Sequence, residues 1–119
     1  MALDPAKRRE LHWSHREKTV ARAAFDAALA RENASIRTEV EDMLQRSNKP
    51  SAVWDILELL SKKQREVERK YDYRYSVLIG VFARLLCEGW IGEVDLAGLS
   101  PEKLQLIQQG AATVKELDA

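Results

Sequence analysis

Between residues 53 and 85, side chains of one set recur at alternating steps of four and three residues without interruption. This spacing places them on a single face of a helix and is typical of a coiled-coil seam, whereas a strand would repeat every second residue. The pattern therefore predicts one long helix with a seam that another helix must cover. Its positions are Val53, Leu57, Leu60, Gln64, Val67, Tyr71, Arg74, Leu78, Val81 and Leu85.

The ends of this helix are predicted from the residues that flank the seam. Pro50 disfavours a helical residue before it, and Ser51 is a good N-cap. Gly89 supplies the left-handed residue that commonly ends a helix. We therefore expect a long helix over residues 51–88, weakened only by Gly80 in its interior.

A second helix is expected before this one. Ser14 and Glu17 have the spacing of a capping box, which predicts a helix over residues 14–48 and a flexible N-terminus over residues 1–13.

The last part of the chain is expected to form a small helical head over residues 90–110. Ser100 and Pro101 open its final helix with a cap and a first-position proline, and Gly110 is expected to close it. Residues 111–119 would then be a frayed tail. The sequence thus predicts one all-α domain over residues 1–119.

The length of the predicted helix argues for a homodimer. At about 1.5 Å per residue, residues 51–88 would extend about 55 Å, whereas a compact chain of this size is about 35 Å across. A symmetric second copy, with the long helices antiparallel, would cover the seam. The predicted dimer interface consists of Val53, Leu57, Leu60, Gln64, Val67 and Tyr71. The alternative is a monomer in which the helix breaks near Gly80 and folds back.

Charge and apolar content limit the partners. Lys and Arg together number 19, Asp and Glu together number 19, and this balance disfavours nucleic acid and anionic lipid. The longest apolar run, residues 77–83, is too short to span a bilayer, and the start of the chain has no signal-peptide pattern. We expect a cytoplasmic protein, in keeping with the single Cys87.

Residues with catalytic or metal-binding chemistry are few. His12 and His15 are one helical turn apart but have no third ligand nearby, and Cys87 has no histidine near it in sequence. Phosphate-binding loops, zinc motifs and nucleophile elbows are absent from the sequence. We expect no enzyme, no cofactor and no metal site.

Aromatic residues suggest a binding surface instead. Trp54 lies in the first turn of the long helix, and Tyr71, Tyr73 and Tyr75 cluster with arginines farther along. Trp, Tyr and Arg often dominate protein interfaces. Trp54 could equally be a core residue packed on the first helix. Nucleic-acid binding by the tyrosines is the weaker alternative, because acidic residues lie between the basic ones.

The middle of the chain resembles the cyanobacterial fluorescence recovery proteins, most strongly over residues 54–89 and more thinly over residues 23–107. The first helix adds a fainter match at Ala23, Phe25, Ala28, Arg31 and Glu32. The stronger matching residues are Trp54, Leu60, Ser61, Lys63, Glu66, Lys70, Tyr71, Asp72, Arg74, Ser76, Val77, Phe82, Ala83, Leu85, Leu86, Glu88 and Gly89.

This resemblance implies a helical dimer that binds the photoactivated orange carotenoid protein and hastens its return to the resting form. It also implies a partner-binding patch at Trp54, Leu57, Glu58 and Gln64. The family has histidine and arginine where this chain has Leu57 and Gln64, and its acid is one methylene shorter than Glu58. Two functions therefore stay open: a regulator of the carotenoid protein, and an interaction module for another helical or two-domain partner.

Overall fold

The structure is a computed structural model that describes residues 11–118. These residues form four α-helices and one short 3-10 helix, without a β-strand, which confirms the all-α prediction. The elements are α2 (His15–Arg46), α3 (Ala52–Lys70), α4 (Leu78–Glu88), η1 (Glu93–Leu96) and α5 (Pro101–Asp118).

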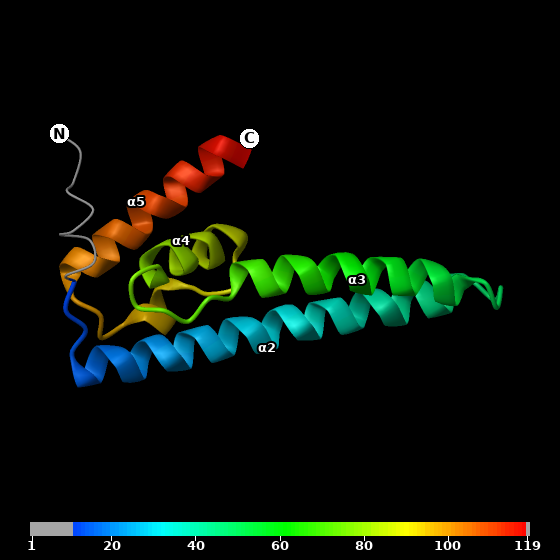
Figure 1. Cartoon of the computed structure of the whole chain (residues 1–119), viewed down its shortest axis with the longest axis horizontal. Coiled ribbons are helices and arrows are strands. Elements are labelled where there is room, and N and C mark those ends of the chain that lie inside the picture. Colours follow the sequence, from blue (N-terminus) through cyan, green and yellow to red (C-terminus); the bar gives the residue numbers. More distant parts are fainter. Residues whose placement is uncertain (1–10, 119) are drawn as a thin grey trace.

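The chain divides into an elongated arm and a compact head (Figure 1). We call residues 33–70 the arm: the C-terminal half of α2 runs antiparallel to α3 there. The head contains α4, η1 and α5, packed on the N-terminal half of α2. The radius of gyration is 17.3 Å, well above the roughly 13–14 Å of a compact chain of this length. The arm therefore projects beyond the head.

Local capping signals predicted several helix ends correctly. Ser14 and Glu17 form the expected capping box, with the Glu17 amide 3.1 Å from Ser14 Oγ and the Ser14 amide 3.0 Å from Glu17 Oε1. Gly89 ends α4 at φ 83°. Ser51 occupies the N-cap position of α3, but its side chain makes no capping hydrogen bond.

The predicted single helix over residues 51–88 is wrong, because α3 ends at Lys70 and α4 begins only at Leu78. In the intervening segment, Tyr71 and Tyr73 turn toward the head and pack edge-on against Phe25, with ring centroids 5.3 Å and 4.9 Å apart. Such aromatic pairs add stability beyond the area they bury. Burial of the two tyrosines thus overrides the seam pattern, and the break precedes Gly80.

The predicted flexible N-terminus over residues 1–13 is wrong at its C-terminal end. Trp13 is only 5% exposed and belongs to the core of the head. The rest of that prediction, residues 1–10, lies outside the described residues.

The last helix does not close at Gly110, and residues 111–118 are not a frayed tail. Helix α5 continues to Asp118, where a carboxylate oxygen lies 2.7 Å from Nη1 of Arg84 in α4. A Cβ at Gly110 would lie 2.8 Å from Cβ of Ala83. The glycine therefore permits the close crossing of α4 and α5 and does not cap a helix.

A buried ion pair connects the N-terminal ends of α2 and α5. Oε2 of Glu17 lies 3.1 Å from Nζ of Lys103 and accepts a hydrogen bond from the Ser100 amide at 2.9 Å. Burial alone would raise the pKa of Glu17, but the hydrogen bonds from the Ser14 and Ser100 amides and the Lys103 ammonium outweigh it and lower the pKa to about 2. One carboxylate thus caps the N-termini of both α2 and α5.

Candidate partner-binding surface

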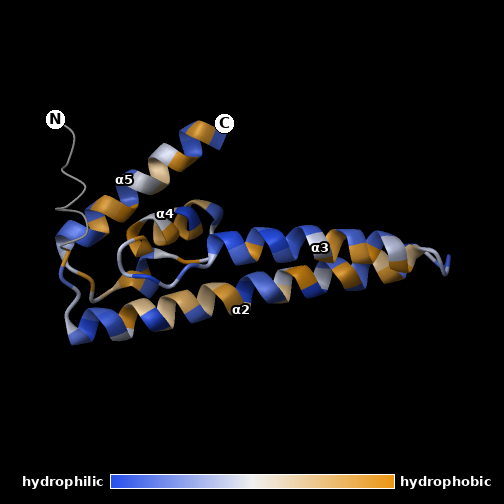
Figure 2. Ribbon diagram, in the orientation of Figure 1, coloured by the Kyte–Doolittle hydropathy of each residue, from blue (hydrophilic) through white to orange (hydrophobic). Residues whose placement is uncertain are grey.

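Helix α3 presents a large apolar surface on the arm. None of its residues is buried within the chain. Trp54 is 68% exposed and Leu57 is 53% exposed, values far above those of core residues. Figure 2 shows hydrophobic residues gathered on α2 and α3 at the end of the arm that is distant from the head. Exposed apolar surface of this kind is typical of interaction sites.

The exposure of Trp54 contradicts its interpretation as a core residue packed on α2. A core tryptophan packed on α2 would be mostly covered, whereas two thirds of this residue is open to solvent. Glu58, one helical turn farther along α3, is also exposed. The structure therefore brings these two members of the predicted partner-binding patch onto one accessible face.

A row of side chains along α3, which we call the stripe, consists of Val53, Leu57, Leu60 and Gln64. All four residues are exposed in the chain and follow one another at steps of four and three. Beside it lies a mainly apolar groove of about 320 Å³ between α2 and α3. The groove is lined by Asn33, Ile36, Leu60, Lys63, Gln64, Val67 and Glu68. The stripe thus continues into a hollow that the chain itself leaves open.

Tyr71 does not extend the stripe. It lies just beyond the last residue of α3, and its hydroxyl donates to Oε1 of Glu32 at 2.8 Å. Burial, the hydrogen bond to the Glu32 carboxylate and the charges of Glu32 and Glu88 raise the pKa of Tyr71. The Tyr71 side chain packs at the junction of arm and head, so we omit it from the interface proposed below.

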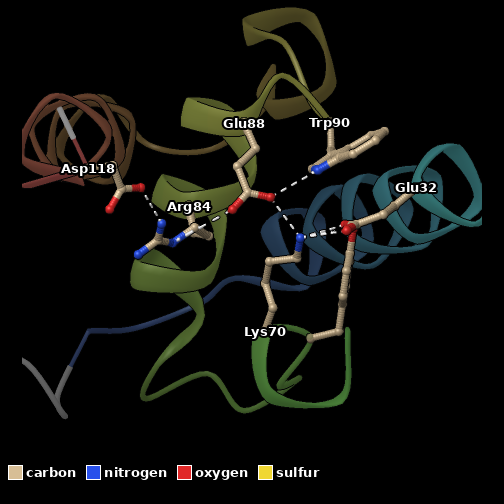
Figure 3. A network of polar contacts seen from close by, with 7 residues as sticks. Glu32, Lys70, Arg84, Glu88, Trp90 and Asp118 are labelled. Atoms are coloured by element: carbon tan, nitrogen blue, oxygen red, sulfur yellow. Dashed lines mark hydrogen bonds and ion pairs between the residues drawn. The ribbon is translucent and has the colours of Figure 1, made fainter. Parts of the chain in front are cut away.

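Lys70 forms an ion-pair network at the same junction (Figure 3). Its Nζ lies 2.7 Å from Glu32 of α2 and 2.7 Å from Glu88 of α4. Glu66, one turn before Lys70 on α3, has the i,i+4 spacing of an ion pair, but Lys70 pairs with Glu32 and Glu88 instead. Sequence spacing could not reveal the network, because its members come from three separate helices.

The other candidate groups do not assemble into a site. His12 and His15 are exposed, Cys87 is partly buried, and residues 11–118 contain no cluster of three or more side chains suited to a metal. Arg74 is paired with Asp72, which neutralises one cation of the tyrosine cluster. Among the described helices, none is both long and apolar enough to cross a membrane.

These observations define an all-α protein with a head and a projecting arm that exposes apolar side chains. Residues 13–111 match the family model described as photoprotection regulator fluorescence recovery protein. The chain belongs to the fluorescence recovery protein family, which confirms the resemblance noted in its sequence.

Individual relatives agree with this assignment. The chain is 34% identical over 99 residues to the fluorescence recovery protein of Synechocystis sp. PCC 6803, covering 83% of this chain and 91% of that protein. It matches the solved structure of the Fremyella diplosiphon protein with a TM-score of 0.78 and 38% identity. The solved Synechocystis structure matches with a TM-score of 0.79 and 34% identity. Each match covers 85% of this chain and 99% of the solved one.

Proposed function

We propose that this protein is a non-enzymatic regulator that binds the photoactivated orange carotenoid protein and hastens its return to the resting form. Membership of the fluorescence recovery protein family supports the proposal. The observation that links the proposed function to particular residues is the 68% exposure of Trp54, with the exposed Glu58 one turn away. A regulator of this kind acts by binding one conformation of its partner more tightly than another.

We further infer that the protein acts as a homodimer through the stripe and Val67. Val53, Leu57 and Leu60 are 53%, 53% and 40% exposed. Full burial of an exposed side chain of this size contributes about 1.5–3 kcal/mol, and roughly half of that surface is still open on each of these residues. A second copy presents the same stripe, so two antiparallel arms would cover each other.

The direct test is the recovery of resting-state absorbance by a photoactivated orange carotenoid protein in the dark. We expect the protein to accelerate recovery, and Trp54→Ala to weaken binding by about 2 kcal/mol or more. Circular dichroism of the variant should remain that of the native fold, because Trp54 is not part of the core. A well-folded native protein that neither binds nor accelerates recovery would exclude this function.

A second function is supported by the chemistry at two exposed positions. The patch contains apolar Leu57 and uncharged Gln64, and neither can form the charged hydrogen bonds of an arginine. This composition favours an interaction module for a different helical or two-domain partner.

The double variant Leu57→His, Gln64→Arg separates the two functions. A restored arginine should raise affinity for the carotenoid protein by roughly ten- to a hundredfold, since a charged hydrogen bond contributes about 1.5–3 kcal/mol. Leu57 and Gln64 also belong to the stripe, so the two proteins are compared at equal dimer concentration. Acceleration by the double variant alone would then indicate that the native patch serves another partner. Acceleration by the native protein would show that Trp54 and Glu58 suffice.

A further inference from the structure

Lys70 joins three helices at the junction of arm and head. It is the last residue of α3, and its side chain is only 13% exposed. Its ammonium contacts Glu32 on α2, which is 8% exposed, and Glu88 on α4 (Figure 3). A single side chain at the end of the arm therefore connects directly to the head.

Both carboxylates are held by additional donors. Glu32 accepts from the Tyr71 hydroxyl at 2.8 Å, and Glu88 accepts from Nε1 of Trp90 at 3.0 Å. Oε2 of Glu88 also lies 3.9 Å from Nε of Arg84. Because each carboxylate is fixed by its own neighbours, Lys70 can occupy only a narrow range of positions.

Apolar contacts at this point come from Tyr71 and Tyr73, which follow the last residue of α3 and pack on Phe25, whereas α3 itself adds no buried residue. A cavity of about 690 Å³ adjoins Lys70, and its walls include Lys63 and Glu66 of α3 together with Arg84 of α4. Helix α3 contributes no buried residue, and the segment from 71 to 77 that follows it is not helical. Helix α2, by contrast, runs without a break from head to arm. Relative to the head, α3 is therefore held in two ways, along the arm by α2 and at its own C-terminal end by the Lys70 network.

We propose that Lys70 is a positioning residue that fixes the orientation of α3, and hence of Trp54, relative to the head. Its effect on a partner rests on the function proposed above, whereas its effect on the arm does not. Loss of the ammonium removes the bridges to α2 and α4 together, so the last turn of α3 and the start of the segment after it become more mobile, while Tyr71 and Tyr73 still contact Phe25.

Hydrogen exchange of backbone amides tests this directly in the full chain. The reporters are the amides of Tyr71, Asp72 and Val77, which bond to Val67, Lys70 and Arg74 carbonyls. Lys70→Met keeps an unbranched apolar stem but removes the charge. We expect these amides to exchange about tenfold faster or more in the variant, while core amides of α4 and α5 keep their rates.

Lys63→Met is the matched control. Lys63 also lies on α3 and lines the cavity, but its ion pair, 4.0 Å long, is with Glu39 of the arm and not with the head. It should leave the three reporter amides unchanged. Equal acceleration by both variants, or a uniform acceleration throughout the Lys70→Met protein, would overturn the proposal.

The double variant Lys70→Met, Glu32→Gln separates positioning from simple charge balance. It leaves no unpaired carboxylate at position 32, so global stability should move back toward that of the native protein. The bridge to α2 and α4 is still missing, so the reporter amides should stay fast. Their return to native rates would show that Lys70 only neutralises a charge, and would overturn the proposal.

Activity on the partner tests whether Lys70 positions Trp54 as well as the end of α3. If the native protein accelerates recovery of the photoactivated carotenoid protein, Lys70→Met should weaken that effect, whereas Lys115→Met, at an exposed lysine of α5, should not. An unaltered effect in a Lys70→Met protein with fast reporter amides would overturn positioning of Trp54. Failure of the native protein itself would count against the proposed function, and the exchange results would still decide the role of Lys70 in the arm.

Discussion

At the scale of single residues, Glu17 connects three separate groups of the chain through one carboxylate. Its two oxygens accept hydrogen bonds from the Ser14 amide, the Ser100 amide and the Lys103 ammonium. Lys103 in turn donates to the His12 carbonyl at 2.6 Å. The first and last helices of the described chain are therefore joined at their N-terminal ends by a charged group with little access to water.

Glu17→Gln should destabilise the fold by about 3–5 kcal/mol, because it leaves the buried ammonium of Lys103 without its counter-charge. Urea unfolding followed by circular dichroism measures the change. Glu116→Gln, an exposed substitution on α5, is the control and should change stability by less than about 0.5 kcal/mol. Equal stability of the two variants would contradict the role given to the ion pair.

The same carboxylate gives the fold a defined acid sensitivity. The pKa of Glu17 is lowered from 4.5 to about 2 in the folded protein, so the folded state favours the ionised form. Its contribution to stability is complete above the unfolded pKa and is lost as the pH falls toward about 2. The difference in free energy of unfolding between native protein and Glu17→Gln should therefore shrink over this range. A difference independent of pH would contradict the lowered pKa.

At the scale of elements, the crossing of α4 and α5 depends on a residue without a side chain. Gly110→Ala should destabilise the protein by about 1–3 kcal/mol, because its new methyl group would meet Ala83 Cβ at 2.8 Å. Gly80→Ala is the matched control, since a Cβ there has no neighbour within 4 Å. It should stabilise α4 by about 0.5–1 kcal/mol. Thermal unfolding of both variants measures this contrast, and stabilisation by both would contradict the tight crossing.

The helix ends that the sequence predicted correctly are those set by neighbouring residues. Ser14 with Glu17, and Gly89 with its left-handed backbone, act within one turn of a helix. The break after Lys70 could not be predicted in this way, because it depends on Phe25, far away in sequence, receiving two tyrosine rings. Coiled-coil spacing describes only what a continuous helix would place on one face.

The grouping of exposed residues on α3 was also predictable from neighbouring residues. The side chains of Val53, Trp54 and Leu57 lie on one uninterrupted helix, so their spacing alone determines how they are grouped. The Lys70 network joins residues of three helices, and only the folded chain brings them together. Local order in the sequence thus defined the surface of the arm but not its attachment to the head.

At the scale of the whole molecule, the oligomeric state tests whether the exposed stripe of α3 is a dimer interface. Light scattering should give twice the 13.6 kDa mass of the chain at micromolar concentration. Leu60→Glu should shift the protein toward monomers, because an unpaired carboxylate would be buried in the interface. Leu117→Glu, on the 79% exposed Leu117 of α5, should leave the dimer intact. A native protein that is monomeric, or dissociation by both variants, would contradict an interface through the arm.

The separation of the chain into arm and head also bears on the order in which it folds during synthesis. Helices α2 and α3 are neighbours in sequence and can pair as soon as α3 has left the ribosome. The head must wait, because Glu17 finds Lys103 and Arg31 finds Asp95 only after most of the chain has emerged. The apolar stripe of the arm is therefore exposed for a time in a chain whose head has not yet closed.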